Sequence, residues 1–301
     1  MPEMNWAGRE VIPSLAEIYQ QLYVVPSENG AEQYREIVLK GHPPARKNLD
    51  HFITSDNDSC CTEHTPAGDA TVITLDERAD FEMFLQIMCN RCTPQEIPAT
   101  QGAVHVSGII NRPKVDAFME TWHKEHPDAS PQEWTDAFQA FQKDKSGYTD
   151  TLIILSTGPY SAVPAEDMNL SEAEWLRLSL IIRKTHELTH FICRKLFPSQ
   201  VSAVWDELVA DAAGLYAAFD CFEPARAERF LGIRDGLYVG GRLENYCPDG
   251  TEKNLQALSE KIHAILLRFE KLMNAPGGAS LYDLILELEQ RQSEWWPENP
   301  S

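Results

Sequence analysis

The segment His186-Glu187-Leu188-Thr189-His190 is an H-E-x-x-H motif inside a long apolar stretch of the chain. Residues four apart share one face of an α-helix, so both imidazoles can direct a nitrogen toward one metal ion, with Glu187 beside them. Two buried histidines that only need hydrogen-bond partners would produce the same letters. The surrounding sequence therefore has to decide between a metal site and an ordinary buried helix.

The flanks of the motif predict one long helix over Glu172 to Leu196. Ser171 and Glu174 have the spacing of a capping box, in which a hydroxyl and a carboxylate satisfy the first free backbone donors. Phe197-Pro198 ends the pattern, because proline cannot continue a helix. Apolar residues recur between these signals at helical spacing, at Trp175, Leu176, Leu178, Ile181 and Ile182.

A second predicted helix, Val201 to Tyr216, carries Glu207 and Asp211 four residues apart on one face. Catalytic zinc usually has three protein ligands, so Glu207 is our candidate for the third ligand beside His186 and His190. Ligating histidines also need their second ring nitrogen held, and Asp211 could do this. The alternative for the pair is a solvated acidic stripe on a surface helix.

His186 to His190, taken with Glu207-Leu-Val-Ala-Asp211, resembles the gluzincin class of zinc metalloproteases. In that class the H-E-x-x-H helix is followed by a helix with a glutamate ligand, in several families as E-x-x-A-D. The resemblance is confined to these two segments. It implies a zincin-like fold with one catalytic Zn²⁺ and a peptide or protein substrate. The third-histidine pattern of metzincins and the inverted H-x-x-E-H pattern do not occur.

The predicted chemistry is hydrolysis by a metal-activated water. Zinc lowers the pKa of its bound water toward neutrality, and Glu187 would accept the proton and later deliver it to the leaving amine. The resemblance implies an additional donor for the oxyanion, and Tyr246 is our candidate because the preceding Gly240-Gly241 permits close backbone approach. The competitors for this role are Tyr216, Tyr238, Arg242 and His263.

Thr151 to Ser156 is a short apolar, β-branched run that predicts a strand. The resemblance implies that a strand just before the metal helix lines the cleft and pairs with an extended substrate through its free edge. The alternative is a plain core strand. For the function as a whole, two alternatives remain open: a zinc amidase acting on a non-peptide substrate, and a non-catalytic sensor or interaction protein whose zinc only fastens two helices.

Charge and hydropathy restrict the partners. The net charge of −20 argues against nucleic acid and anionic membranes, since both draw on clustered Lys and Arg. No apolar stretch is long enough to span a membrane, and the N-terminus lacks a signal-peptide pattern, so we expect a soluble cytoplasmic protein. Seven cysteines do not suggest a disulfide framework. Cys89 and Cys92, with Cys60-Cys61-His64 upstream, leave a structural zinc site conceivable.

The whole pattern predicts an α+β fold that is mainly helical, with a small sheet and a cleft between two lobes. We expect residues 1–150 to form an α+β region of unknown role and residues 151–301 to form the catalytic region. The sequence does not predict an oligomeric state. Further expected helices begin at Ser14, Ser130, Thr251 and Leu281, and further strands cover Ala70 to Leu75 and Ala103 to Ile110, while Asn48 to Asp69 is expected to be a loop.

Overall fold

The structure, a computed structural model, describes residues 4–199, 202–247 and 250–296. Its chain divides into two compact units, one of residues 1–63 and 70–156 and the other of residues 64–69 and 157–301. The fold is α+β, as predicted, with 57% helix and a small mixed sheet among the described residues. Within those ranges no helix has the length and apolarity that crossing a membrane requires.

The first unit is built on a five-stranded sheet with strand order β1-β2-β3-β5-β4. Strand β3 runs parallel to β5, whereas β4 is antiparallel to β5 and β1 is antiparallel to β2. The predicted strands at Ala70 to Leu75 and Ala103 to Ile110 are confirmed as β3 and β4. The bounds are β1 Asn5–Ala7, β2 Ser59–Thr65, β3 Gly68–Leu75, β4 Ala103–Ile110 and β5 Thr149–Ser156.

The predicted strand at Thr151 to Ser156 is present as β5, but its expected place at a free edge was wrong. β5 lies inside the sheet, with β3 on one side and β4 on the other. Leu152 to Leu155 are consecutive and completely buried. Such a continuous apolar run, without alternation, is typical of a central strand covered on both faces. Among the described strands of this sheet, β4 and β1 form the edges.

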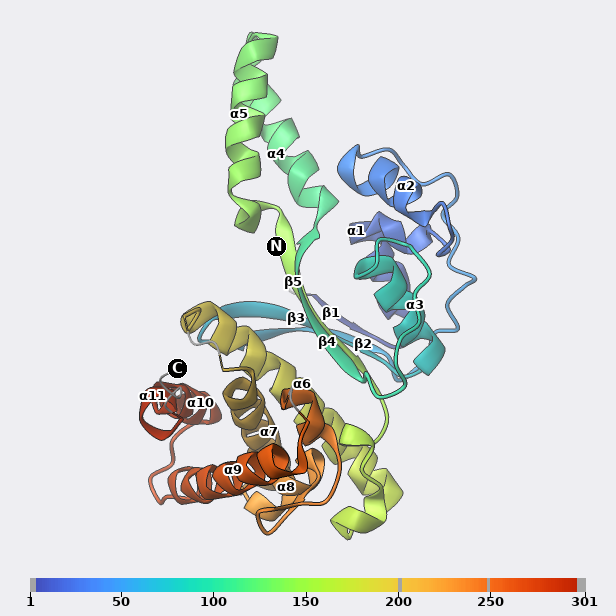
Figure 1. The fold of residues 1–301 in the computed structure, drawn as a ribbon. Helices are drawn as coiled ribbons and strands as arrows, with labels where there is room; N and C mark the ends of the chain where they lie inside the picture. The colour runs from blue at the N-terminus through green and yellow to red at the C-terminus, as the bar shows by residue number, and fades with distance from the viewer. Residues whose placement is uncertain (1–3, 200–201, 248–249, 297–301) are drawn as a thin grey trace. The chain divides into compact units, whose positions relative to one another are not determined.

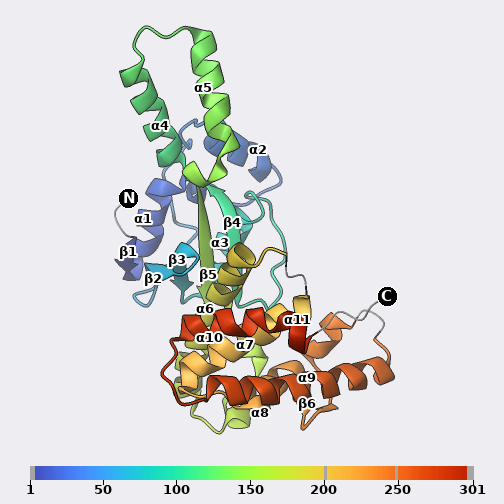
Figure 2. The ribbon, with the colours of Figure 1, turned by 90° about the vertical axis from the view of Figure 1, so that its left-hand side faces the viewer.

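Helices α1 (Val11–Ile18), α2 (Gly30–Tyr34) and α3 (Arg78–Met88) lie on one side of this sheet (Figure 1). Their buried side chains form one core with alternate residues of the strands, including Ile12, Leu15, Phe81, Phe84, Ile73, Leu152 and Ile154. Helices α4 (Arg112–Glu125) and α5 (Pro131–Lys143) form a hairpin that extends away from the sheet (Figures 1 and 2). The capping box predicted at Ser130 is formed at the start of α5.

Two local predictions in this unit were wrong. The helix expected from Ser14 begins earlier, at Val11, and ends at Ile18, followed by a 3-10 turn over Gln20–Tyr23. The earlier start buries Val11 and Ile12 completely, so tertiary burial overrides the capping signal. The polar segment Asn48 to Asp69, which was expected to be a loop, contains strand β2. Backbone hydrogen bonds to β1 stabilise this strand, which the side chains alone do not predict.

The second unit is a helical assembly that begins with α6 (Glu172–Leu196), at the bounds predicted from the sequence. Ser171 caps α6 by accepting a hydrogen bond from the backbone N–H of Glu174. The C-terminal helices expected from Thr251 and from Leu281 are present as α9, which Thr251 caps, and α10, and the short helix α11 follows α10. The remaining elements are α7 Ala203–Phe219, α8 Pro224–Leu231, β6 Ile233–Arg234, β7 Leu237–Tyr238, α9 Glu252–Met273, α10 Leu281–Gln290 and α11 Gln292–Trp295.

Helices α6 and α7 pack together at a point where there is no room for a side chain. A Cβ atom added to Gly214 of α7 would lie 2.8 Å from the backbone oxygen of Ile182 and 2.9 Å from its Cγ2 atom. Gly214 near the end of α7 meets Ile182, whereas Asp206 near the start of α7 meets His190 further along α6, so the two helices run antiparallel. This arrangement brings the end of α6 next to the start of α7.

We expect Gly214→Ala to destabilise the protein by about 1–3 kcal/mol, because an added methyl group must push the two backbones apart. Gly277→Ala is the matched control, since a Cβ at that position meets no atom within 4 Å. Urea unfolding followed by circular dichroism measures both. Equal stability of the Gly214→Ala protein and the parent would show that α6 and α7 are not in backbone contact.

Candidate metal centre

Three donor groups from α6 and α7 converge in the second unit. The Nε2 atoms of His186 and His190 lie 2.9 Å apart. The carboxylate of Glu207 approaches them at 3.7 Å from Nε2 of His186 and 3.5 Å from Nε2 of His190. Both imidazoles are buried, and the carboxylate is partly exposed to solvent. The structure thus brings together the three residues that the sequence analysis chose as ligands.

The spacing of these donors suits a small tetrahedral cation. Bond lengths near 2.0–2.1 Å at tetrahedral angles separate two ligand atoms by about 3.3 Å. The three observed separations of 2.9, 3.5 and 3.7 Å bracket this value. Two imidazoles and one carboxylate are also the donor set of many catalytic zinc sites, which keep a fourth position for water. The residues present therefore fit a zinc ion.

The second nitrogen of His186 is held by two buried groups. Its Nδ1 atom lies 3.0 Å from Oδ1 of Asp211 and 2.8 Å from the hydroxyl of Tyr160. The Tyr160 hydroxyl in turn donates to the same Oδ1 at 2.6 Å. A proton on Nδ1 satisfies the carboxylate and leaves the lone pair of Nε2 directed at the donor cluster. Asp211 therefore occupies the supporting position predicted for it.

Asp211 is itself neutralised by a cation. Its other oxygen forms an ion pair with Arg242, which also donates to the hydroxyl of Ser161 at 3.3 Å. Burial raises the pKa of Asp211, but Arg242 and His186 outweigh this effect and lower it to about 2. Burial likewise raises the pKa of Glu207, while His190 and His186 lower it to about 2. Both carboxylates are therefore ionised at neutral pH, and that of Glu207 can act as a ligand to a cation.

His190 has its own carboxylate. Nδ1 of His190 lies 2.9 Å from Oδ2 of Asp206, which is an ion-pair distance, although the angle is too poor for a good hydrogen bond. Burial lowers the pKa of His190, but Asp206 and Glu207 together raise it to about 10. Each histidine of the cluster thus has a carboxylate behind it, on the side away from the shared space.

Glu187 and Tyr246 both belong to this part of the second unit. Glu187 follows His186 on α6 and is half-buried. Tyr246 ends the 3-10 turn Arg242–Tyr246, and its phenol lies near the Glu207 carboxylate. Burial and the charge of Glu207 raise the pKa of Tyr246, so its phenol keeps its proton at neutral pH.

The competitors proposed for Tyr246 are placed differently. Arg242 reaches the cluster, but through Asp211. Tyr238 hydrogen-bonds to Glu244, and His263 pairs with Glu228, so both are engaged elsewhere. Tyr216 lies on α7 and is half-buried.

Sequence analysis missed Tyr160. It lies in a 3-10 turn, Tyr160–Ala162, between β5 and α6, and its backbone N–H donates to Ser179 of α6. No spacing rule connects this loop position with Asp211, 51 residues later. Asp206, in contrast, could have been predicted from the sequence as a member of the site. It comes one residue before Glu207, which places it on a neighbouring face of the same helical turn.

The conceivable zinc site at Cys89 and Cys92 does not receive support. The described residues contain two groups of three or more potential ligands, and neither group includes these cysteines or Cys60, Cys61 and His64. The thiol of Cys92 is buried and points toward the backbone oxygen of Gln21.

Replacing Asp211 by asparagine keeps the shape of the side chain but removes the charge that holds His186. We expect Asp211→Asn to lower zinc affinity roughly 10–100-fold, as for other residues that orient a metal ligand. Competition with a chromophoric chelator measures this affinity. Asp220→Asn at the exposed C-terminus of α7 is the control, and equal affinity in the two variants would contradict the supporting role of Asp211.

The comparisons with known proteins give one match. A family model described as a family of unknown function, DUF7005, matches residues 10–280. No curated protein and no solved structure matches the chain. Since the matched segment covers most of the 301 residues, the chain belongs to the DUF7005 family, whose function is unknown.

Proposed function

We propose that the protein is a zinc-dependent hydrolase, most specifically a metallopeptidase with a zincin-like arrangement. The observation that carries this proposal is the convergence of His186, His190 and Glu207, together with the carboxylates that hold both imidazoles from behind. A structural metal site is usually closed by four protein ligands, whereas three ligands leave a position for water. The cluster contains three potential ligands, His186, His190 and Glu207.

Zinc at this position would supply a water molecule that loses its proton near neutral pH and would polarise the carbonyl group under attack. Glu187 is adjacent to His186 and half-buried, so its carboxylate can accept the proton of the water and pass it to the leaving amine. Tyr246 keeps its proton and lies near the Glu207 carboxylate. Its phenol can therefore donate to the oxyanion that forms beside the cluster.

The choice of a peptide bond rests on the resemblance of the two motifs to gluzincins. A zinc amidase would use the same residues in the same roles, because the site polarises any carbonyl group. Cleavage profiling with a peptide library distinguishes these two hydrolases: a peptidase cleaves a subset of the library, whereas an amidase of non-peptide substrates leaves it intact.

Glu187→Gln tests the catalytic role directly. We expect the variant to retain about one zinc per chain, since no ligand is changed, but to lose at least about 100-fold in turnover because the proton acceptor is gone. Metal analysis and peptidase assays measure the two effects separately. Glu172→Gln, at the exposed start of the same helix, is the matched control.

An active Glu187→Gln protein would show that another group accepts the proton. If neither parent nor variant cleaves peptides or amides while both hold zinc, the metal is structural and the protein is not a hydrolase of this type.

Glu207→Ala tests the ligand set. We expect zinc content after dialysis to fall sharply, because two imidazoles alone form an incomplete site. Glu223→Ala, just before α8, controls for the loss of an acidic side chain from the same unit. Unchanged zinc content in Glu207→Ala would mean that a different carboxylate, with Asp206 first in line, completes the site.

A further inference from the structure

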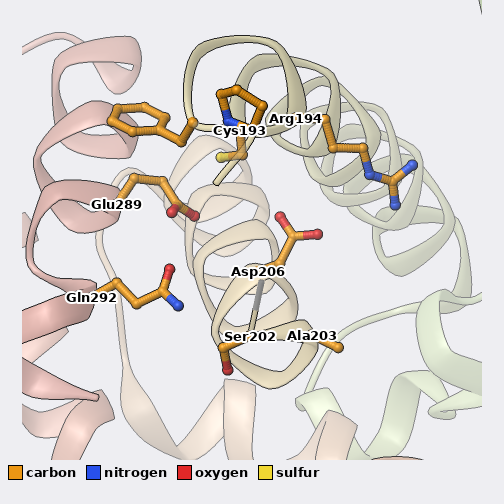
Figure 3. A pocket seen from close by; sticks show the side chains of 9 residues that line it. Cys193, Arg194, Ser202, Ala203, Asp206, Glu289 and Gln292 are labelled. Atoms are coloured by element: carbon orange, nitrogen blue, oxygen red, sulfur yellow. The ribbon is translucent and has the colours of Figure 1, made fainter. Parts of the chain in front are cut away.

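A second group of ligand-type side chains lies where α6, α7 and α10 meet. The Sγ atom of Cys193 and carboxylate oxygens of Asp206 and Glu289 all lie within 4.8 Å of one another. These residues line a cavity of about 290 Å³, and their side chains point into a common space (Figure 3). Cys193 and Glu289 are 5% and 2% exposed, so the cavity holds a thiol and a carboxylate that are almost fully removed from water.

A fourth polar side chain points into the same space. Gln292 of α11 lines the cavity beside Glu289 (Figure 3) and is only 8% exposed. Within residues 4–199, 202–247 and 250–296, its side-chain amide forms no hydrogen bond. The amide is therefore an additional donor for something bound in the cavity.

We propose that Cys193, Asp206 and Glu289, with the amide oxygen of Gln292, bind a second divalent cation. The donor set decides which cation suits the site. Carboxylate and amide oxygens alone would favour Mg²⁺ or Ca²⁺, but a thiolate shifts the preference toward zinc and metals of similar softness. Four donors of this kind also match the usual coordination number of zinc.

Binding of a cation in this cavity would be coupled to the release of protons. Burial raises the pKa of Glu289 to about 7, and the nearby charge of Asp206 adds to this effect. Burial and the charge of Glu289 also raise the pKa of Cys193. Without a metal the thiol thus keeps its proton, whereas binding of a divalent cation would displace that proton to solvent and offset the repulsion between the two carboxylates.

The second site shares a residue with the first. Asp206 lines the cavity and also lies 2.9 Å from Nδ1 of His190. Changes at Asp206 would therefore disturb both centres. Cys193 and Glu289 belong to the second group alone, which makes them the clean positions for a test.

Titration of the metal-free full-length protein with Co²⁺ tests this proposal. Cobalt bound by a thiolate shows a sulfur-to-metal charge-transfer absorption in the near ultraviolet, which a site of two imidazoles and one carboxylate cannot produce. We expect this absorption to appear and to saturate at one equivalent of thiolate-bound cobalt per chain. It should persist in Glu207→Ala, so failure of the first centre and failure of the second are distinguishable.

We expect Cys193→Ser to abolish the absorption and Glu289→Gln to weaken cobalt binding at this site at least 10-fold, because even the loss of a residue that only orients a metal ligand costs about this much. Cys221→Ser is the matched control, because this half-buried thiol lies beside Glu223 outside the cavity. Absence of the absorption in the parent protein overturns the proposal, and so does its persistence in Cys193→Ser. If Cys193→Ser does not fold, an unchanged absorption in Glu289→Gln has the same meaning.

Discussion

The backbone contact between α6 and α7 is the constraint on which the candidate metal centre depends. Gly214 allows α7 to approach Ile182 of α6 without an intervening side chain. The antiparallel return then places Glu207 opposite His186 and His190 at distances of 3.5 to 3.7 Å. Because two of the donors come from one helix and the third from the other, the separation of the helices sets the size of the space between them.

The charges around this space are arranged in pairs. Asp211 is 1% exposed and is balanced by Arg242 on one oxygen and by His186 and Tyr160 on the other. Removing ionised groups from water costs free energy that ion pairing only partly offsets, and apolar residues of the same volume would stabilise such a core as well or better. Buried ionised groups gathered at one place are instead typical of functional sites. The network thus agrees better with the proposed metal site than with a purely stabilising role.

The periodicity of the sequence was sufficient to predict α6 with its bounds and to select Glu207 and Asp211, because these features depend on residues close together in the chain. Tyr160 could not be predicted, since its hydrogen bond to Asp211 depends on how a loop packs against two helices. The order of the strands in the sheet could not be predicted from the sequence for a similar reason. The apolar run of β5 indicated a strand, but whether it lay at an edge was determined by β4, which precedes it by some forty residues and has no sequence signal for its partner.

Two adjacent residues of α7 contribute to both of the proposed metal centres. Consecutive residues on a helix point in directions about 100° apart. Glu207 faces the imidazoles of α6, while Asp206 lies between His190 and the cavity that Glu289 of α10 also lines. In the sequence the two form a single acidic pair, which charge patterning alone interprets as a solvated surface. The geometry separates them: one carboxylate completes a cluster of imidazoles, and the other connects that cluster to a neighbouring thiol and carboxylate.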